Sequence, residues 1–256
     1  EDGAFLKIEA ELSVLQELSD RFTFYVPDYK HMAKFKLKIW DGKIRLLNIK
    51  NGKIYQGLLS GIIDYCKENN FEYELIEKES GYFNASSLSE FEAKEYIEKE
   101  LKLPSSFEVR DYQLKAFVSA IRNKRRLFLS PTSSGKSLII YMVSRYLLDT
   151  FKVNKWLIIV PRTALAIQLS KDFEDYGYDE PVGTIFSGKK KEVEPDIVIS
   201  TWQSIYSIIQ KDSEWLDKFD GIIGDEAHLF KSNVLTKIME GAREADIRFG
   251  FTGTLD

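Results

Sequence analysis

The stretch Ser130-Pro131-Thr132-Ser133-Ser134-Gly135-Lys136-Ser137 follows a predicted strand at Arg126–Leu129 and opens a predicted helix at Lys136–Leu148. This is the context of a phosphate-binding loop, in which N–H groups at the start of a helix face an anion. Gly135 permits close approach of the backbone, Lys136 adds a positive charge, and Ser137 offers a hydroxyl to Mg²⁺. Ser130 stands where the general motif has its first glycine. The alternative is an ordinary strand–turn–helix with a chance Gly-Lys-Ser.

A second motif follows a buried-type strand at Gly221–Gly224 and reads Asp225-Glu226-Ala227-His228. Two adjacent carboxylates at the carboxyl end of such a strand lie where ligands bind in an open parallel sheet. We expect Asp225 to hold Mg²⁺ and Glu226 to accept a proton from an attacking water, which makes Glu226 and Lys136 the candidate catalytic residues. The alternative, a strand end with solvated acids, loses weight because both motifs occur in this order.

From Phe107 onward, short apolar strands alternate with helical segments. Strands are predicted at Trp156–Val160, Ile197–Ser200 and Arg248–Phe251, and helices at Tyr112–Ile121 and Ala164–Tyr176. Such alternation predicts an α/β fold with a parallel sheet covered on both faces.

Six short motifs follow one another in this part of the chain: Arg110–Gln113, Pro131–Ser137, Val160–Thr163, Ser200–Gln203, Asp225–His228 and Thr252–Thr254. Because these motifs occur in the same order in superfamily 2 helicases of the DEAH-box-like type, residues 107–256 resemble that family. The resemblance implies a RecA-like P-loop lobe that binds ATP and Mg²⁺ and contacts DNA. It implies adenine contacts by Arg110 and Gln113, and phosphate contacts by Thr132, Ser133, Ser134, Gly135, Lys136 and Ser137. It implies DNA-backbone contacts by Arg162, Thr163, Thr201 and Trp202, and coupling of ATP state to lobe movement by His228, Thr252 and Thr254.

The N-terminal part is predicted to be a small α+β domain over 1–85, joined by an acidic helical connector over 86–106. Within it we expect a helix from Leu12 to Arg21, a three-stranded basic meander over 34–56, a helix at Leu58–Glu68 and a strand at Phe71–Ile76. The meander is predicted from the strict alternation over Lys34–Ile39 and from two hairpin dipeptides, Asp41-Gly42 and Asn51-Gly52. Ser87 or Ser89 would cap the acidic helix.

Eight basic residues and one acid, Asp41, occur between Lys30 and Lys53. We expect phosphate contacts from this stretch, with the residues Lys34, Lys36, Lys38, Lys43 and Arg45. The alternative is a solvated edge strand, since lysines protect exposed edges from aggregation. The stretch Trp40–Leu46 also resembles the sequence that precedes the helicase core in phage recombination helicases. Trp40 could stack on a base, although a buried aromatic at a hairpin end is the commoner role.

Composition limits the remaining classes. Lys+Arg 36 against Asp+Glu 40 gives a net charge of −4, and 44% hydrophobic with 30% charged residues is typical of a globular protein. The apolar runs are too short to span a bilayer, and no leader sequence is evident. The single cysteine, Cys66, fits a reducing cytoplasm, and two histidines with one cysteine argue against a zinc cluster.

Together these features predict an ATP-dependent DNA helicase or translocase, monomeric and cytoplasmic, that acts on duplex or branched DNA in recombination, repair or replication. Because the sequence stops two residues after Thr254, we expect the first RecA-like lobe without the second. Such a chain would bind ATP but hydrolyse it slowly, since the family's arginine finger comes from the second lobe. The alternatives are a restriction-type or repair translocase, a P-loop kinase, and a DNA-binding module with a vestigial nucleotide site.

Overall fold

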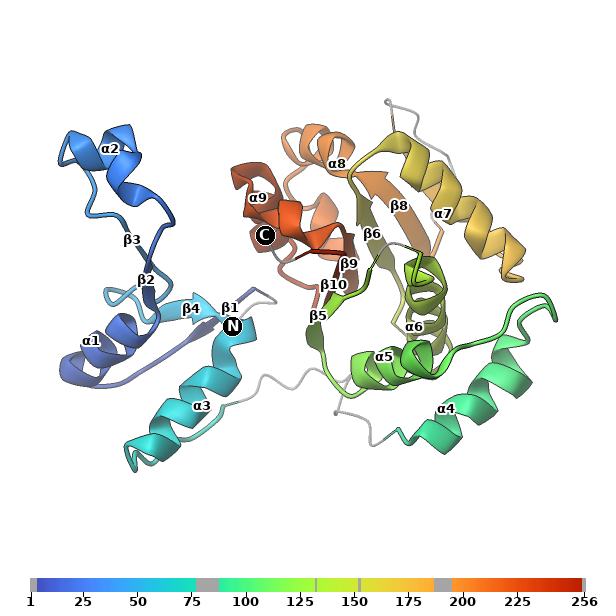
Figure 1. Cartoon of the computed structure of the whole chain (residues 1–256), viewed down its shortest axis with the longest axis horizontal. Coiled ribbons are helices and arrows are strands. Elements are labelled where there is room, and N and C mark those ends of the chain that lie inside the picture. The colour runs from blue at the N-terminus through green and yellow to red at the C-terminus, as the bar shows by residue number, and fades with distance from the viewer. Residues whose placement is uncertain (1–3, 77–87, 132, 152, 187–194, 255–256) are drawn as a thin grey trace. The chain divides into compact units, whose positions relative to one another are not determined.

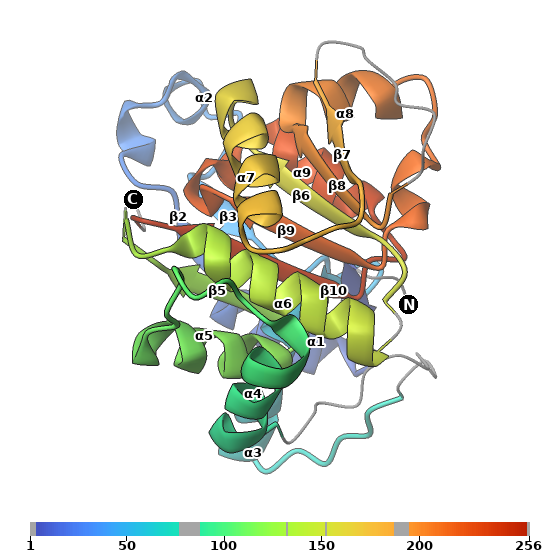
Figure 2. The same cartoon turned by 90° about the vertical axis from the view of Figure 1, so that its right-hand side faces the viewer.

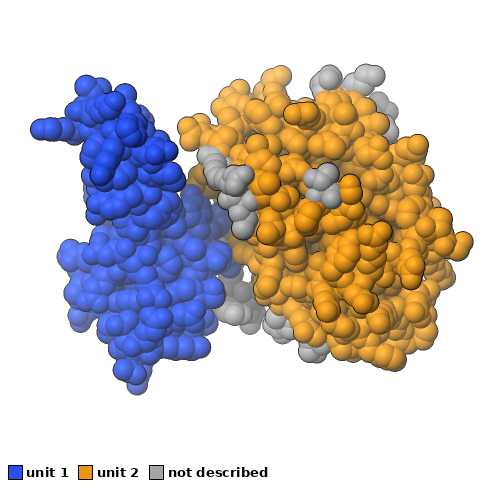
Figure 3. All heavy atoms as spheres, viewed as in Figure 1, with its two compact units in different colours: residues 1–78 blue, residues 79–256 orange. Residues whose placement is uncertain are grey.

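The computed structural model describes residues 4–76, 88–131, 133–151, 153–186 and 195–254. The chain divides into two compact units, Glu1–Lys78 and Glu79–Asp256, which are coloured separately in Figure 3. Of the predicted features, the phosphate ligand Thr132, the cap Ser87 and the boundary between residues 85 and 86 lie outside the described residues.

The larger unit is built on a six-stranded sheet whose neighbouring strands all run parallel. The strand order is β5-β10-β9-β6-β8-β7. The strands are β5 (Arg125–Leu129), β6 (Trp156–Val160), β7 (Val182–Ile185), β8 (Ile197–Thr201), β9 (Gly221–Asp225) and β10 (Ile247–Thr252). This confirms the predicted α/β fold with a parallel sheet.

Helices cover both faces of this sheet (Figures 1 and 2). In β6 the side chains of Trp156, Ile158 and Val160 pack on the side of α5 (Asp111–Ile121), α6 (Lys136–Phe151) and α7 (Thr163–Asp175). The alternate residues Leu157 and Ile159 pack on the side of α8 (Trp202–Ile209) and α9 (Asn233–Gly241). The two-residue period of a strand therefore divides one apolar run between two cores. Short 3₁₀ turns lie at Trp215–Lys218 and Ala227–Lys231.

The predicted strands and helices of this unit are confirmed to within a few residues at their ends. The sequence analysis missed β7, α8 and α9. β7 contains Gly183 within only four residues, so it shows no periodic pattern of its own. In α8, by contrast, the apolar residues Trp202, Ile205, Tyr206 and Ile209 recur at helical spacing, so the sequence does contain a signal for this helix.

The acidic connector belongs to the core of the larger unit. Helix α4 (Glu90–Tyr96) continues as one π-helical turn, Ile97–Leu101, and begins with the predicted capping box between Ser89 and Glu92. Tyr96 is buried, and its hydroxyl donates a hydrogen bond to Asp149 Oδ2 at 2.7 Å. The exposed glutamates thus occupy one face of a helix whose other face is packed.

In its described residues, the smaller unit consists of two antiparallel strand pairs and three helices. β1 (Phe5–Lys7) pairs with β4 (Lys53–Tyr55), and β2 (Thr23–Tyr25) pairs with β3 (Lys43–Arg45). Its helices are α1 (Leu12–Arg21), α2 (Ala33–Lys36) and α3 (Leu59–Glu68), with 3₁₀ turns at Tyr29–His31 and Gln56–Leu58. Its core is formed by Leu15, Leu18, Leu47, Ile54, Ile62 and Tyr65.

The predicted three-stranded meander over 34–56 is wrong. The alternating stretch forms α2 and a turn at Lys38 (φ 56°), and Leu37 and Ile39 remain 69% and 73% exposed. Alternation yields a strand only where a partner strand pairs with it and a core covers its apolar face, and this stretch has neither. The predicted strand at Phe71–Ile76 is wrong for the same reason, with Ile76 90% exposed.

Among the described residues, no helix has the length and apolar character that a bilayer span requires.

Hydrogen bonds from Arg248 link strand β10 to the end of helix α9, and their contribution to stability can be tested. Its buried guanidinium donates to the carbonyls of Ala245 at 2.8 Å, Met239 and Ala242, at the end of α9. We expect Arg248→Met to lower the free energy of unfolding by about 2–4 kcal/mol, because it leaves buried acceptors without donors. Urea denaturation measures this effect. The control Arg126→Met, at an exposed position of β5, should cost less than about 0.5 kcal/mol, and equal costs would contradict the explanation.

Candidate functional site

The candidate site lies at the carboxyl edge of the sheet, where three neighbouring strands end together. β10 lies between β5 and β9, and the register pairs Thr252 with Leu129 and Phe251 with Asp225. Because parallel strands end at the same edge, the loops that follow them meet there, although they are far apart in the sequence. The three loops carry the two predicted motifs and the Thr252-Gly253-Thr254 tripeptide.

The loop after β5 is fixed by serines. Ser130 is buried, its N–H donates to the carbonyl of Thr252 at 2.7 Å, and its hydroxyl lies 2.6 Å from that of Ser134. Ser130, which replaces the motif's first glycine, therefore links the start of the loop to Ser134 near its end. Ser133 and Gly135 have φ values of 64° and 73°, which turn the loop into the start of α6.

Gln113 supports the same loop from α5. Its side chain is buried, accepts a hydrogen bond from the N–H of Arg110 at 2.9 Å, and donates one to the carbonyl of Ser134 at 3.0 Å. A Cβ atom at position 135 would lie 2.3 Å from Gln113 Nε2, so only glycine fits there. The Tyr112 hydroxyl also donates to Ser134 O, at 2.9 Å, while Arg110 is exposed and donates to that hydroxyl.

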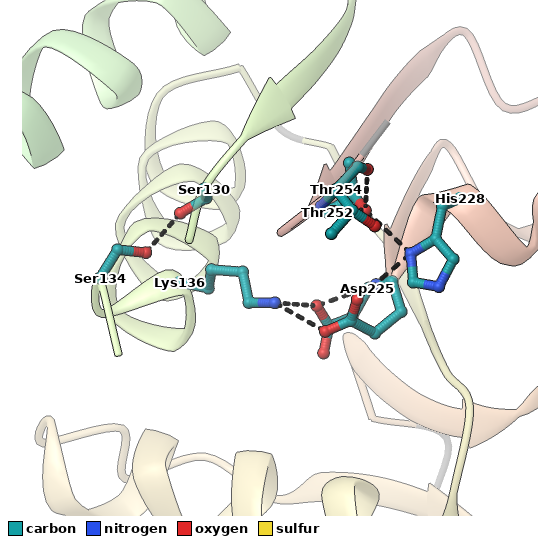
Figure 4. Close-up of polar contacts among 8 residues, drawn as sticks. Ser130, Ser134, Lys136, Asp225, His228, Thr252 and Thr254 are labelled. Atoms are coloured by element: carbon teal, nitrogen blue, oxygen red, sulfur yellow. Dashed lines mark hydrogen bonds and ion pairs between the residues drawn. The ribbon is translucent and has the colours of Figure 1, made fainter. Parts of the chain in front are cut away.

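Opposite charges meet at the centre of the site. Lys136 Nζ lies 2.8 Å from Glu226 Oε1 and 3.5 Å from Asp225 Oδ1 (Figure 4). Burial disfavours the charged amine, but the hydrogen bond to Glu226 and the two carboxylate charges raise the pKa of Lys136. Burial likewise raises the pKa of Asp225, and the attraction of Lys136 offsets this only in part. One cation thus balances two carboxylates in a partly desolvated place.

His228 connects this charged centre to the end of β10. Its Nδ1 lies 2.9 Å from Thr252 Oγ1 and 3.4 Å from Glu226 Oε2. Thr252 Oγ1 in turn donates to the carbonyl of Thr254 at 2.7 Å (Figure 4). The structure therefore brings all three predicted coupling residues together, in one chain of contacts with Glu226.

Sequence reasoning missed Tyr176, which directly follows α7. Its hydroxyl lies 2.8 Å from Ser137 Oγ, and its ring packs against Phe107 and Tyr141. No pattern in the sequence links residues 137 and 176, because the contact depends on how α7 crosses α6. The hydroxyl predicted to bind a metal thus has a buried aromatic partner that orients it.

The residues at this edge fit a magnesium ion that is held partly by protein oxygens and partly by phosphate oxygens. Ser137 and Asp225 supply two oxygen donors, the type that Mg²⁺ prefers, and Mg²⁺ is usually held by one or two carboxylates plus substrate phosphates and water. Among the described residues, no three His, Cys, Asp or Glu side chains gather as a complete metal cage.

The predicted DNA-contact residues of this unit lie on the same edge but differ in accessibility. Arg162 is exposed at the start of α7, next to Thr163. Thr201 is buried, and its hydroxyl accepts from Ser204 N as the cap of α8, while Trp202 packs into the core beside it. Arg162 is therefore the most accessible of the four side chains.

In the smaller unit, Lys34, Lys36 and Lys38 are exposed, on α2 and the turn after it rather than on one strand face. Lys43 Nζ lies 5.0 Å above the ring of Tyr25, and Arg45 pairs with Asp41. The Trp40 indole N–H donates to Lys43 O at 2.8 Å, so this ring has a structural contact.

In comparisons with known proteins, two different family models match the two ends of the chain. Residues 106–256 match the family model described as type III restriction enzyme, res subunit, and residues 1–76 match that described as DNA helicase UvsW, N-terminal. The ATP-dependent DNA helicase uvsW of Enterobacteria phage T4 is 32% identical over 264 residues, covering 99% of this chain and 51% of that protein.

Two crystal structures of UvsW from bacteriophage T4 superpose over almost the whole chain. One has a TM-score of 0.83 at 29% identity, covering 99% of this chain and 90% of that one. The other has a TM-score of 0.85 at 30% identity, covering 100% of this chain and 52% of that one. This chain spans about half or less of the length of the curated relatives it matches.

Replacing Asp225 tests the charge balance of the site. Since its pKa is raised in the folded state, the wild-type protein loses stability as the pH rises from the ordinary aspartate value of 3.8 through the folded pKa. We expect Asp225→Asn to raise Tm by about 2–4 °C at pH 7, which is about 1 kcal/mol for a chain of this size, and by less at pH 4.

Thermal unfolding at the two pH values measures this effect. Glu226→Gln is the control and should give no gain, because that carboxylate is 30% exposed and directly hydrogen-bonded to Lys136. A Tm of Asp225→Asn at or below that of the wild type at pH 7 would contradict the explanation.

Proposed function

The chain belongs to the family described as type III restriction enzyme, res subunit, and from this premise we propose that it forms the nucleotide-binding part of an ATP-driven DNA helicase or translocase. The predicted resemblance to superfamily 2 helicases, and to phage recombination helicases within them, is confirmed by both family models and by the T4 relative. The motor activity, the branched DNA substrate and a role in recombination, repair or replication are proposed for the protein as a whole.

The observation that carries the proposal is the meeting of Lys136 with Asp225 and Glu226, at 3.5 and 2.8 Å, next to the start of α6. The first N–H groups of a helix lack intrahelical acceptors, so they and Lys136 favour an anion at this point. Lys136 would exchange its carboxylate partners for the β- and γ-phosphates of ATP. Its release from Glu226 would leave that carboxylate able to accept a proton from the attacking water.

Magnesium would complete the site. Ser137 and Asp225 would hold the ion, with Tyr176 orienting the serine hydroxyl. When bound, the ion would neutralise negative charge that develops on the phosphates. Ser133, Ser134 and Gly135 would surround the phosphates with backbone N–H groups; Thr132 is proposed with them from the motif alone.

Adenine recognition is proposed for Arg110 and Gln113. Arg110 is exposed, and a guanidinium plane can stack on a base. A side-chain amide has two N–H donors and an oxygen with two lone pairs, of which Gln113 uses one each toward Ser134 and Arg110. One N–H and one lone pair therefore remain for the base, so Gln113 could support the loop and contact adenine at once.

His228, Thr252 and Thr254 are proposed to couple nucleotide state to movement. Glu226 would change partners when ATP binds, and His228 touches both Glu226 and Thr252. A change at the phosphates would thus reach the segment that follows β10 through two contacts.

DNA is proposed to contact both units through its phosphates. In the larger unit, the contacts are proposed for Arg162, Thr163, Thr201 and Trp202; in the smaller unit, for Lys34, Lys36, Lys38, Lys43 and Arg45. A restriction-type translocase would use the same ATP and DNA sites, so this alternative remains part of the proposal. The monomeric state and the cytoplasmic location stay predictions.

The nucleotide site is tested by Lys136→Ala. This change removes a charge-assisted contact of about 1.5–3 kcal/mol, so Mg²⁺-ATP binding should weaken at least about tenfold in calorimetry. Lys171→Ala, at an exposed position of α7, is the matched control and should bind like the wild type. Unchanged affinity in Lys136→Ala would refute the assignment.

The smaller unit is tested by the salt dependence of duplex DNA binding. If Lys34, Lys36 and Lys38 each touch a phosphate, their joint replacement by alanine should reduce the log–log slope by roughly 2–3. Joint replacement of the exposed Lys67, Lys94 and Lys171 removes the same charge elsewhere and should leave the slope nearly unchanged. Equal slopes in the two triple variants would contradict phosphate contacts by Lys34, Lys36 and Lys38.

A further inference from the structure

The segment between β2 and β3 forms a projection that the helicase resemblance does not explain. The two strands pair antiparallel, with Tyr25 opposite Lys43, and residues 26–42 between them contain a 3₁₀ turn and α2. We name residues 26–42 the tip segment. Figure 1 shows α2 at the end of this strand pair that is remote from α1 and α3.

The tip segment contains a groove of about 650 Å³ that combines cations with apolar walls. Three lysines line it, Lys30, Lys36 and Lys38, together with Phe35, Ile39 and Trp40. One acid, Asp41, also lines it, but its carboxylate pairs with Arg45 and accepts the N–H of Lys43 at 3.1 Å. The net charge that the groove presents is therefore positive.

The walls of the groove are fixed by contacts behind them. The Trp40 ring is held by its N–H bond to Lys43 O, and the Phe35 ring packs edge-on against Tyr29, which stacks on Tyr25. Gly42, with φ 82°, lets the chain pass Tyr29 where a Cβ would lie 2.2 Å from the ring. The aromatic surface is thus positioned before any ligand arrives, which lowers the entropic cost of binding.

The front of the groove is open. Ile39 is 73% exposed, and none of the ion pairs seen among the described residues involves Lys36 or Lys38. Lys38 adopts a left-handed backbone conformation (φ 56°), which is unfavourable for a non-glycine residue. A short segment that exposes an isoleucine and strains a lysine is not explained by the stability of the fold.

Only some ligands match both features of this groove. The phosphates of a duplex would satisfy the lysines, but its bases are stacked inside and cannot reach Trp40 or Ile39. An acidic peptide would also satisfy the lysines and would not need a fixed ring. An unpaired nucleotide offers both a flat π-face and flanking phosphates, the combination that proteins bind with aromatic platforms and basic grooves.

We propose that the groove of the tip segment binds an unpaired nucleotide of single-stranded DNA, with its base against Trp40 and Ile39 and its phosphates on Lys36 and Lys38. This inference rests on the proposed DNA binding of the smaller unit and specifies it. Where a duplex opens at a branch, the groove would take the unpaired strand, so the unit would distinguish branched from uninterrupted DNA.

The test compares two strands that carry the same phosphates. Binding of the whole chain to (dT)10 and to a ten-unit abasic strand is measured by fluorescence anisotropy at one salt concentration. We expect (dT)10 to bind about tenfold more tightly or better, since stacking on one base supports a change of that size. Ile39→Ser and Trp40→Ala should reduce this ratio toward one and leave the affinity for the abasic strand unchanged.

Lysine variants separate the groove from a general phosphate track. Lys36→Ala and Lys38→Ala should weaken binding of both strands, whereas Lys34→Ala, on the same helix but outside the groove, should weaken it less. Circular dichroism verifies folding, and Ile39→Ser keeps the test decisive if Trp40→Ala unfolds the tip, because Ile39 is exposed.

Equal affinity for the two strands, or a ratio that survives in folded Ile39→Ser, would overturn the inference. If the three-lysine variant still lowers the salt slope in that case, the proposed duplex contact stands and only the groove assignment falls. If the wild-type chain binds no DNA, both fall.

Discussion

Parallel pairing of β10 with both β5 and β9 is the constraint on which the candidate site depends. It sets Leu129 opposite Thr252 and Asp225 opposite Phe251, so that the segments that follow the three strands share one edge. β9 and β10 are buried on both faces and contribute to two separate cores, whereas β5 is an edge strand on which Leu127 and Leu129 remain exposed. The three loops that contribute to the polar site are therefore held by three paired strands, of which β9 and β10 lie in the buried part of the sheet.

In contrast to the sheet that carries it, the charged centre of the site is energetically unfavourable in the free protein. Lys136 shares its charge between two carboxylates, and burial raises the pKa of Asp225 despite that neighbour. Such an arrangement costs stability in the free protein, and binding of a polyphosphate with a divalent cation would supply the charges that each side lacks. Neutral contacts hold the surrounding groups in place: Ser130 with Ser134, Gln113 with the loop carbonyl, and Tyr176 with Ser137. Preorganisation of this kind limits the rearrangement that ligand binding requires.

The smaller unit follows a different principle. Its core is small, and its strands are three residues long, so it can carry a projection whose side chains are not needed for packing. Lysines and apolar residues alternate over Lys34–Ile39, where Phe35 packs against Tyr29 but Leu37 and Ile39 face solvent because no second element covers them. This freedom distinguishes the tip segment from the connector helix α4, whose charged residues likewise alternate with apolar ones but whose Ala93 and Tyr96 are buried against the larger unit.

The sequence by itself determined the α/β class, the positions of the six-stranded sheet's main strands and the identity of the charged centre. It could do so because strand periodicity, helix caps and the loops at Ser130–Ser137 and Asp225–His228 are local signals, each contained within a few residues. The tertiary structure alone decided which side chains meet. The contact of Tyr176 with Ser137, the second role of Gln113 under the loop, and the burial of Thr201 arise from helix crossing and strand order, which join residues far apart in the chain. It also decided the fate of Lys34–Ile39, because an alternating pattern becomes a strand only when a neighbouring strand and a core accept it, and neither is encoded within the pattern itself.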